Sequence, residues 1–448
     1  MNATLSSLLS TVLIDRSQGH RREVLRLYQQ RRDADQLSSD VRTGQTAARL
    51  ARLLNHARKW VPHYRDVLRH QPEIVPESSR QILAQLPILT RSDIQAHPQR
   101  FLSEQPGQTT WDDFTGGSSG TPLCFKVDRS TQLAREASLR WANALAGGRN
   151  GDRIAMLWGS DRDHAASLRD WRLGLRWWID NMRWFNAFNM AEERMAEYHA
   201  DLTRFRPHLI VAYAGSLFTF ANYLRDHGLK PHYPVKALVS SAEILTAPMR
   251  ETIEEVFGCR VFDRYGNREA GAIAAECDVH AGLHINETDF VVEVGSLDPV
   301  QEPGPLLITY LANFAMPLIR YDTGDVAAIA RGPCPCGRGG MRLARVIGRQ
   351  SDTIRTASGK LVHGEYFTHV LYGSRGVREF QFVQEDLHHY RLVLVCDRRD
   401  PDQERHWTNK IRDVVGQESA VVIDYVPAIP ALSSGKRRFT LSKVKSAN

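Results

Sequence analysis

Hydrophobic positions in the first hundred residues recur with the period of a helix. Four of them fall at i, i+3, i+4 and i+7, the spacing that gathers side chains on one helical face: Leu50, Leu53, Leu54 and Ala57. Pro62 is expected to end this helix. Thr90, followed by Asp93, predicts a capping box that begins a further short helix. We therefore expect a helical amino-terminal region whose apolar stripe packs into the core.

From about residue 105 the pattern changes to short apolar runs, each followed by an amphipathic stretch. The runs predicted as strands are 153–158, 208–213, 237–241 and 259–263. Strands that alternate with helical segments, such as 188–206 and 246–257, indicate a mostly parallel sheet. Two further runs, 289–295 and 305–311, have no long helix between them and predict a β-rich subdomain.

Glycine, proline and cysteine interrupt the pattern at 331–351 and predict a break in the fold there. Beyond it, strands at 390–396 and 420–426 and a helix at 403–415 predict a small domain. The fold class is α/β: a large amino-terminal domain with parallel sheets and a β-rich subdomain, plus a small mobile carboxy-terminal α/β domain. We expect the domains to span 1–348 and 352–448.

Composition narrows the class of protein. Hydrophobic residues are 42% and charged residues 24% of the 448, which is ordinary globular usage. No apolar run approaches the roughly 18–20 residues that span a bilayer, and residues 1–22 lack the features of a signal peptide. We therefore expect a soluble cytoplasmic protein without a membrane partner. The net charge of +7 favours polyanions such as nucleotides, but its even spread argues against nucleic acid as a partner.

A glycine- and hydroxyl-rich loop is the first candidate site. Its backbone N–H groups and hydroxyls can cradle phosphate oxygens, and an ordinary surface loop is the alternative. The residues concerned are Thr115, Gly116, Gly117, Ser118, Ser119, Gly120, Thr121 and Pro122. The same letters spell G-x-S-x-G, but a hydrolase elbow needs a strand directly before and a helix directly after, and neither is expected here.

Four later motifs carry further polar chemistry. They are Asp263-Arg264-Tyr265-Gly266-Asn267-Arg268-Glu269, Arg320-Tyr321-Asp322-Thr323-Gly324-Asp325, Gly348-Arg349-Gln350-Ser351-Asp352 and Ser434-Gly435-Lys436-Arg437-Arg438. An aromatic ring at the end of a strand can stack on a base, a glutamate can hold Mg²⁺, and an aspartate can bind a ribose diol. A lysine on a glycine-bearing loop can reach a phosphate. Ordinary turns and a solvated basic tail are the alternatives.

Cysteines form a second candidate site. Cys334 and Cys336 share a tight turn, and Cys277 precedes both His280 and His284. Three thiolates and one imidazole can hold tetrahedral Zn²⁺, and a reduced surface turn is the alternative. The other three cysteines are expected to be small buried residues: Cys124, Cys259 and Cys396.

The order of these motifs resembles that of the adenylate-forming superfamily, which includes acyl- and aryl-CoA synthetases. Within it, the sequence is similar to the phenylacetate–CoA ligase-like and CapK-like branch. The branch resemblance is carried by Leu86-Pro87-Ile88-Leu89-Thr90 with Asp93, by Tyr-Gly-Asn-Arg-Glu and by the cysteine pattern, and it covers residues 45–440 approximately. One departure is Arg268, where many relatives carry serine or threonine.

The resemblance implies a role for each matching residue. The loop residues Thr115, Gly116, Ser118, Ser119, Gly120 and Thr121 would bind the β- and γ-phosphates of ATP, and Ser241, Ala242 and Glu243 would line the adenine and acyl pocket. Tyr265, followed by Gly266, would stack on adenine, and Asp263 would reach the adenine amine. Glu269 would hold Mg²⁺, Asp325 the ribose and Arg349 the ribose or phosphates. Lys436 would bridge the substrate carboxylate and the α-phosphate, and His284 would complete a structural zinc site.

The sequence indicates few residues that would line the acyl pocket. Trp158 and Tyr213, each at the end of a predicted strand, are candidate substrate contacts, with core packing as the alternative. The tryptophan-rich segment 158–187 is interpreted mainly as an amphipathic surface helix or a dimer interface.

We expect an AMP-forming ligase that adenylates an aryl or arylacetic acid and passes the acyl group to CoA. The rival hypotheses are transfer to an amine or hydroxyl, and a nucleotide-binding interaction protein without catalysis. A homodimer is an open possibility.

Overall fold

A computed structural model describes residues 15–115, 123–158, 177–187, 190–295, 302–349 and, within 353–444, all except 359–360, 364, 372–373, 375, 397 and 431–438. The described chain forms two compact units. The first unit comprises residues up to 323 together with 327–346, and the second comprises 324–326 and 347–448. No helix among the described residues is long and apolar enough to cross a membrane.

The amino-terminal region is helical, as predicted. The apolar stripe of α3 is buried against α5 and the strands that follow, and α4 begins at Pro62. The capping box is also confirmed, because Thr90 N donates to Asp93 (2.8 Å) and Asp93 N donates to Thr90 Oγ1 (3.2 Å). The helices are α2 (Asp15–Ala34), α3 (Ser39–Trp60), α4 (Pro62–Val67), α5 (Pro76–Gln85) and α6 (Arg91–Ala96).

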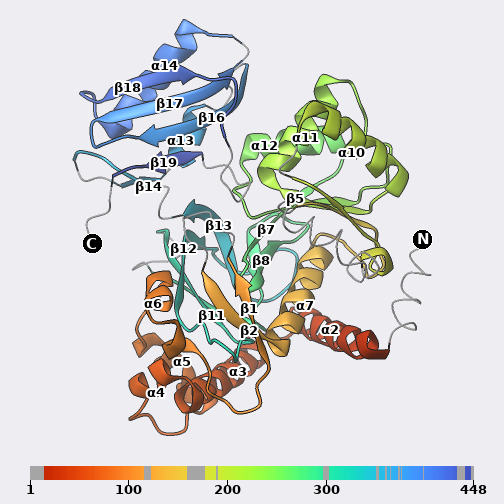
Figure 1. Ribbon diagram of the computed structural model, residues 1–448, viewed down its shortest axis with the longest axis vertical. Coiled ribbons are helices and arrows are strands. Elements are labelled where there is room, and N and C mark those ends of the chain that lie inside the picture. Colours follow the sequence, from red (N-terminus) through yellow and green to blue (C-terminus); the bar gives the residue numbers. More distant parts are fainter. Residues whose placement is uncertain are drawn as a thin grey trace. The chain divides into compact units, whose positions relative to one another are not determined.

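Eleven strands within the described residues form one sheet, in the order β10-β11-β12-β13-β9-β8-β7-β6-β5-β3-β4. Figure 1 labels β5, β7, β8, β11, β12 and β13 of this sheet. They are β3 (Ile154–Leu157), β4 (Met182–Phe185), β5 (Leu209–Tyr213), β6 (Ala237–Ser241), β7 (Val261–Asn267), β8 (Gly271–Glu276), β9 (Leu283–Ile285), β10 (Phe290–Val294), β11 (Gly304–Tyr310), β12 (Tyr321–Ile329) and β13 (Arg342–Arg349).

The strands from β7 to β4 are parallel, as the alternating pattern predicted. Strands β5 and β6 are buried at every position, which is typical of parallel strands covered on both faces. Three helices connect successive strands from β4 to β7: α10 (Glu192–Phe205), α11 (Ala214–Asp226) and α12 (Ala247–Phe257).

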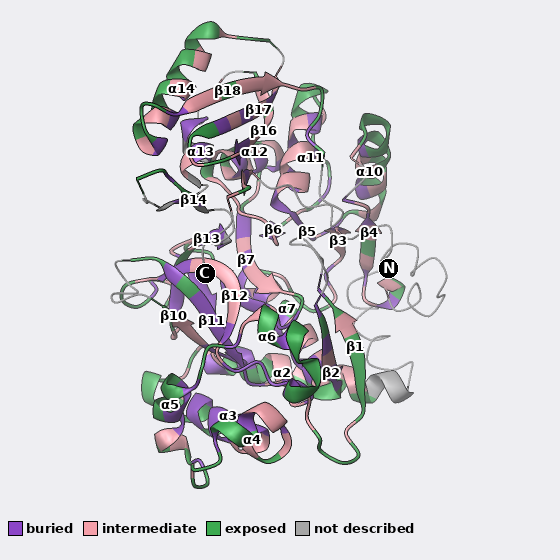
Figure 2. Cartoon of the chain, turned by 60° about the vertical axis from the view of Figure 1, so that its left-hand side comes forward, coloured by how far each residue is buried: buried purple, intermediate pink, exposed green. Residues whose placement is uncertain are grey.

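The rest of the sheet is the predicted β-rich part. Here β8 and β9 are antiparallel to their neighbours, β10 pairs with β11, and β11 is buried along almost its whole length (Figure 2). The predicted break at 331–351 contains the boundary between the two units, at 346/347, and β13 runs across that boundary. The first two residues of β13, Arg342 and Leu343, pair with β9, and this pairing outweighs the glycine and proline signals nearby.

A hairpin and the helix that follows it were not predicted. The strands β1 (Thr110–Phe114) and β2 (Cys124–Asp128) form a separate antiparallel hairpin, and α7 (Arg129–Leu145) follows β2 directly. Asp128 caps α7 through the N–H of Thr131 (2.8 Å). Helix α7 packs against α2, where Val24 meets Leu133 and Ala137.

The second unit has its own core. Its four-stranded sheet has the order β18-β17-β16-β19, and α14 buries Trp407, Ile411 and Val415 at helical spacing. The predicted strands and helix of this region are confirmed. The elements are β14 (Thr353–Arg355), β15 (Leu361–His363), α13 (Glu365–Val370), β16 (Val377–Gln384), β17 (His389–Cys396), α14 (Pro401–Val415), β18 (Ala420–Tyr425) and β19 (Thr440–Ser442).

A buried ion pair connects the first helix to the sheet. Arg31 on α2 donates from Nε (2.9 Å) and Nη2 (2.6 Å) to the carboxylate of Asp289, and the two side chains are only 1% and 5% exposed. Asn286 Nδ2 donates to the same carboxylate (2.7 Å). Because both charges have left water, each depends on the other for stabilisation.

We therefore expect Arg31→Leu to lower the free energy of unfolding by about 3–5 kcal/mol, since it leaves the Asp289 carboxylate buried without its cation. Urea unfolding followed by tryptophan fluorescence measures this change. The matched control is Arg65→Leu, which removes an exposed pair with Glu104 and should cost less than about 1 kcal/mol. Equal losses in the two variants would contradict the prediction.

Candidate functional site

The carboxyl ends of the parallel strands meet at one edge of the sheet. Tyr213, the last residue of β5, pairs with Ser241, the last residue of β6, and Ser241 pairs with Arg264 of β7. Trp158 follows the end of β3. Ligands of open parallel sheets bind in the crevice outside this edge, so the residues here are candidates for a binding site.

Two aromatic residues form a wall at this edge. The rings of Trp158 and Tyr213 lie 4.2 Å apart at an interplanar angle of 32°, and Tyr213 is buried. Offset contacts of this kind stabilise a pair of rings beyond simple burial. The two predicted substrate contacts therefore form one continuous aromatic surface.

The residues after β6 are held by neighbouring strands and helices. Ser241 Oγ donates to the carbonyl of Arg264 (2.9 Å), and Ala242 has a left-handed backbone (φ +68°). Glu243 Oε2 accepts a hydrogen bond from Gly215 N at the start of α11 (2.7 Å). A side chain on Gly215 would crowd that carboxylate. The Ser-Ala-Glu segment is thus fixed against the start of α11.

The Tyr265–Glu269 motif lies at the reversal from β7 to β8. We expected Tyr265 to end a strand, but β7 continues to Asn267, because its backbone pairs with β8 as far as Gly271. Gly266 lies so close to the carbonyl of Gly271 that a Cβ atom would overlap it. Tyr265 therefore projects from a paired strand and is half-buried.

Glu269 occupies the turn itself and is 7% exposed. Its carbonyl accepts from Arg135 Nη2 (2.7 Å), and its Oε1 lies 3.5 Å from the hydroxyl of Tyr321. Burial and the Glu269 carboxylate raise the pKa of Tyr321, so this hydroxyl remains a donor. A carboxylate oxygen is a ligand that Mg²⁺ prefers, so Glu269 fits the predicted role.

Only the base of the glycine- and serine-rich loop lies within the described residues. Thr115 is buried, its N–H donates to Leu123 O (3.0 Å), and its Oγ1 accepts from Leu123 N (2.9 Å) and Arg91 Nη2 (3.2 Å). The other predicted loop residues lie outside the described residues: Gly116, Ser118, Ser119, Gly120 and Thr121. A strand precedes the loop, contrary to our expectation, but β2 and not a helix follows Leu123, which does not fit a hydrolase elbow.

The predicted residues of the last three motifs belong to the second unit. Asp325 lies inside β12 and not in a turn as expected, because β12 continues past Gly324 at φ +74°. Arg349 ends β13, and its side chain is not described. Lys436 lies outside the described residues. The roles of all three remain predictions.

The four predicted metal ligands lie together. One ligand atom each from Cys277, His284, Cys334 and Cys336 falls within 4.8 Å of the others. Cys277 Sγ is 3.7 Å from Cys334 Sγ, and His284 Nε2 is 3.4 Å from Cys336 Sγ. His280 points elsewhere, with Nδ1 3.0 Å from the Glu276 carboxylate.

The chemistry of this cluster suits a metal ion. Burial, aided by two nearby arginines, lowers the pKa of His284 to about 4, so its imidazole is neutral. Burial opposes ionisation of Cys336, but the N–H of Arg338 and the neighbouring thiols lower the pKa of its thiol. A neutral imidazole and three closely spaced sulfur atoms are a tetrahedral zinc donor set.

Two predictions about other residues need correction. Cys124 is exposed and Cys259 and Cys396 are half-buried, because they lie near strand ends and not in the core. In the tryptophan-rich segment, residues 159–176 are not described, but Trp184 lies on a strand, β4, and not on a helix. Its ring stacks on that of Trp177 (5.1 Å), and the parallel pairing of β4 with β3 decides its structure.

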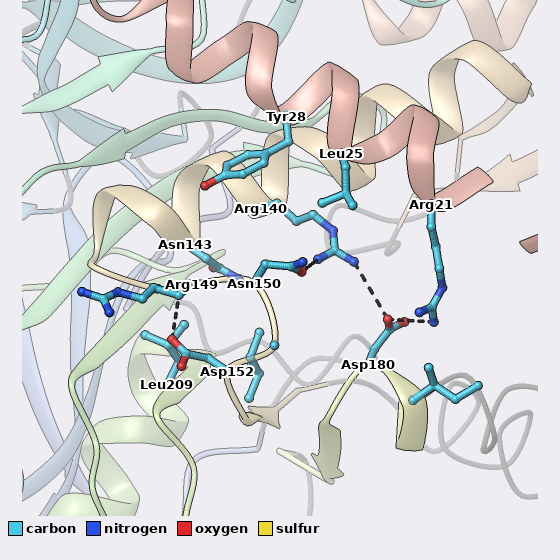
Figure 3. Close-up of a pocket in the computed structure, with 14 residues that line it drawn as sticks. Arg21, Leu25, Tyr28, Arg140, Asn143, Arg149, Asn150, Asp152, Asp180 and Leu209 are labelled. Atoms are coloured by element: carbon cyan, nitrogen blue, oxygen red, sulfur yellow. Dashed lines mark hydrogen bonds and ion pairs between the residues drawn. The ribbon is translucent and has the colours of Figure 1, made fainter. Parts of the chain in front are cut away.

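A cavity of about 70 Å³ lies at the opposite edge of the sheet (Figure 3). It is lined by Ile154 and Leu209, the first residues of β3 and β5. The charged groups around it pair with one another, as Arg21 does with Asp180 (3.0 Å). We therefore locate the candidate site at the carboxyl edge and not in this cavity.

Some residues at the site carried no signal in the sequence. Arg91, Arg135 and Tyr321 contact Thr115 or Glu269, yet Arg91 and Arg135 lie outside the chemical motifs, and Tyr321 had no assigned role. Only the fold brings them to the site.

Comparison with known proteins places the chain among proteins of related sequence. Residues 354–443 match the family model described as the CapK C-terminal domain. Protein CapK of Staphylococcus aureus is 24% identical over 370 residues, which is 81% of this chain and 80% of that protein. Phenylacetate-coenzyme A ligase of Thermus thermophilus is 26% identical over 320 residues, 68% of this chain and 70% of that protein.

Solved structures share the fold. The 2-hydroxyisobutyryl-CoA ligase in complex with R3-HIB-AMP superposes with a TM-score of 0.70 at 19% identity, over 92% of this chain and 91% of that one. The anthranilate CoA ligase AuaEII in complex with anthranoyl-AMP has a TM-score of 0.51 at 16% identity, over 80% and 73% of the two chains.

Asp263 gives the site a testable pH dependence. Burial and the Glu276 carboxylate raise the pKa of Asp263 from 3.8 to about 7, although Arg250 and Arg264 oppose the shift. The pKa of Asp263 is higher in the folded protein than in the unfolded chain. The stability that Asp263 contributes below about pH 4 is therefore lost as the pH rises through 7.

The Asp263→Asn variant has no ionisable group at this position. The free energy of unfolding of the variant minus that of the wild type should therefore rise by at least about 1 kcal/mol from pH 5 to pH 8. Urea unfolding at four pH values tests this. The control, Glu251→Gln, changes an exposed acid on α12 and should run parallel to the wild type. A parallel profile for Asp263→Asn as well would show that the carboxylate ionises freely in the folded protein.

Proposed function

Because the chain belongs to the phenylacetate–CoA ligase-like and CapK-like branch of the adenylate-forming superfamily, we propose that it is an AMP-forming acid–thiol ligase. It activates a carboxylic acid with ATP and transfers the acyl group to a thiol, that of CoA. The observation that best supports this proposal is that the predicted site residues lie together at the carboxyl edge of the sheet. They are Trp158, Tyr213, the Ser241–Glu243 segment and Tyr265, and Glu269 lies in the adjoining turn.

The first half-reaction brings two anions together, since the carboxylate attacks the α-phosphate and pyrophosphate leaves. The loop that begins at Thr115 would hold the β- and γ-phosphates through backbone N–H groups. Glu269 would hold Mg²⁺, which supplies positive charge to the phosphates when bound. Preorganised charges of this kind stabilise the transition state.

The nucleoside and the acid would lie along the carboxyl edge. In this proposal Tyr265 stacks on adenine, Asp263 lies towards its amine, and the Ser241–Glu243 segment lines the pocket. The contact between Trp158 and Tyr213 supports a flat aryl or arylacetic acid, because an aromatic surface favours stacking with another ring.

The second unit would supply the remaining groups. Asp325 would bind the ribose, Arg349 the ribose or phosphates, and Lys436 the carboxylate and α-phosphate. We propose that the domain at 352–448 rotates against that at 1–348 after adenylate formation, which withdraws Lys436 and admits the thiol.

The cysteine cluster is proposed as a structural zinc site. All four ligands are protein groups, which leaves no position for a reacting water molecule. The site would join β9 to the turn that precedes β13, and so stiffen the β-rich part of the first unit.

Acid-dependent ATP–pyrophosphate exchange over a panel of aryl, arylacetic and short aliphatic acids tests the proposed activity. Exchange with an acid, followed by formation of its CoA thioester, is the expected result. An amide or hydroxamate but no thioester would point to an amine acceptor. Absence of exchange with every acid would favour a nucleotide-binding protein without catalysis.

We expect Lys436→Ala to lower the rate of exchange by about 10²–10³-fold, since it removes one preorganised cation from the transition state. Binding of ATP, measured by calorimetry, should be largely kept. The matched control is Lys443→Ala. Lys443 lies on the same carboxy-terminal segment as Lys436 but pairs with Glu385, so its loss should leave exchange unchanged. Undiminished exchange in Lys436→Ala would refute its role.

Purified protein should carry about one equivalent of zinc, measured by plasma mass spectrometry. Cys336→Ser should lower this content and the melting temperature, because a ligand is lost. Cys396→Ser, which changes a half-buried cysteine of the second unit, is the control and should keep the metal. Metal-free wild-type protein of unchanged stability would contradict the assignment.

A further inference from the structure

One arginine of α7 holds two parts of the candidate site at once. Arg135 Nη1 donates to Asp113 Oδ2 (2.7 Å), and its Nη2 donates to the backbone carbonyl of Glu269 (2.7 Å). Asp113 lies on β1, and Glu269 lies in the reversal between β7 and β8, 134 residues from Arg135. The two bonds therefore join segments that the chain itself does not connect nearby.

Each of the two contacts of Arg135 lies next to a proposed binding group, one for phosphate and one for the metal ion. Asp113 lies two residues before Thr115, the buried residue that closes the base of the phosphate loop. Glu269 bears the carboxylate proposed for Mg²⁺. Arg135 binds the backbone carbonyl of Glu269 and not its carboxylate, so it does not compete with a cation for the side chain.

The guanidinium is itself held in place. Its centre lies 5.3 Å from the centroid of the Phe125 ring, its side chain is 16% exposed, and its Nε is buried without a hydrogen-bond partner among the described residues. A guanidinium is planar and its N–H donors have fixed directions, so it can bind two acceptors at a set spacing. The single ammonium group of a lysine cannot reproduce this arrangement. The low exposure also strengthens both hydrogen bonds.

Helix α7 and the turn are locked together next to Glu269. Gly271 has φ +87°, and a Cβ atom there would press on Arg135 and Ser138. Ser138 Oγ, one helical turn beyond Arg135, accepts from Ala272 N (3.2 Å). The arginine thus acts from a rigid support.

We infer that Arg135 is a positioning residue, which holds the strand that ends at the base of the phosphate loop, with Asp113, in register with the turn that carries Glu269. The inference rests on the proposed function. Its consequence is energetic coupling: the metal should strengthen nucleotide binding only while the two parts are held in register.

The test measures that coupling without catalysis. Adenylyl imidodiphosphate is titrated by calorimetry with and without Mn²⁺, and Mn²⁺ binding is followed by electron paramagnetic resonance. In Arg135→Gln the gain in nucleotide affinity caused by Mn²⁺ should fall about tenfold or more, as it does when other supports of metal ligands are removed. Arg135→Lys should retain part of the gain, because a point charge can keep one of the two contacts.

The matched control is Arg129→Gln on the same helix, whose exposed pair with Glu23 lies away from the site and whose loss should leave the coupling unchanged. A merely structural role would lower the fraction of active protein but preserve the ratio of the two affinities. Should Arg135→Gln not fold, Asp113→Asn weakens the same bond from its other end, because it removes the negative charge of the acceptor, and it should weaken the coupling in the same direction.

An unchanged coupling in folded Arg135→Gln or Asp113→Asn overturns the inference. Failure of the wild type to bind the nucleotide at all overturns the proposed function instead, so the two failures are distinct.

Discussion

The reversal of the chain between β7 and β8 is the constraint on which the first unit depends. A Cβ atom on Gly266 would overlap the carbonyl of Gly271, and a Cβ atom on Gly271 would press on Arg135 and Ser138 of α7. This close approach allows β8 to turn back along β7 as an antiparallel strand, and it ends the parallel half of the sheet. The same reversal lifts Glu269 out of the sheet towards α7, so sheet topology and site geometry have one cause.

Much of this architecture could be predicted from the sequence because its signals are local. The parallel strands are short apolar runs, α3 has a strict helical stripe, and Thr90 with Asp93 forms a capping box. The grouping of Cys277 with the later cysteines rested on the donor chemistry of the residues and not on periodicity, and the structure brings the four side chains together.

The remainder depended on contacts between distant segments. Strand β13 begins directly after a glycine- and proline-rich segment, where β9 pairs with its first residues, and Asp325 is a strand residue instead of a turn residue. Likewise Arg135 has no distinctive neighbours in the sequence, and only the packing of α7 against the β7–β8 turn gives it partners. Pairing energies between strands and helices outweighed local propensity at each of these points.

The buried pair of Arg31 and Asp289 has a consequence for synthesis of the chain. Its two members are separated by 258 residues, so the ribosome must release well over half of the protein before the cation on α2 meets its anion. Until then the amino-terminal helix can neither bury that charge nor seat firmly on the sheet that follows. A nascent chain that pauses before Asp289 can already pack α2 against α7, but the attachment of α2 to the sheet through Asp289 is a late event in biogenesis.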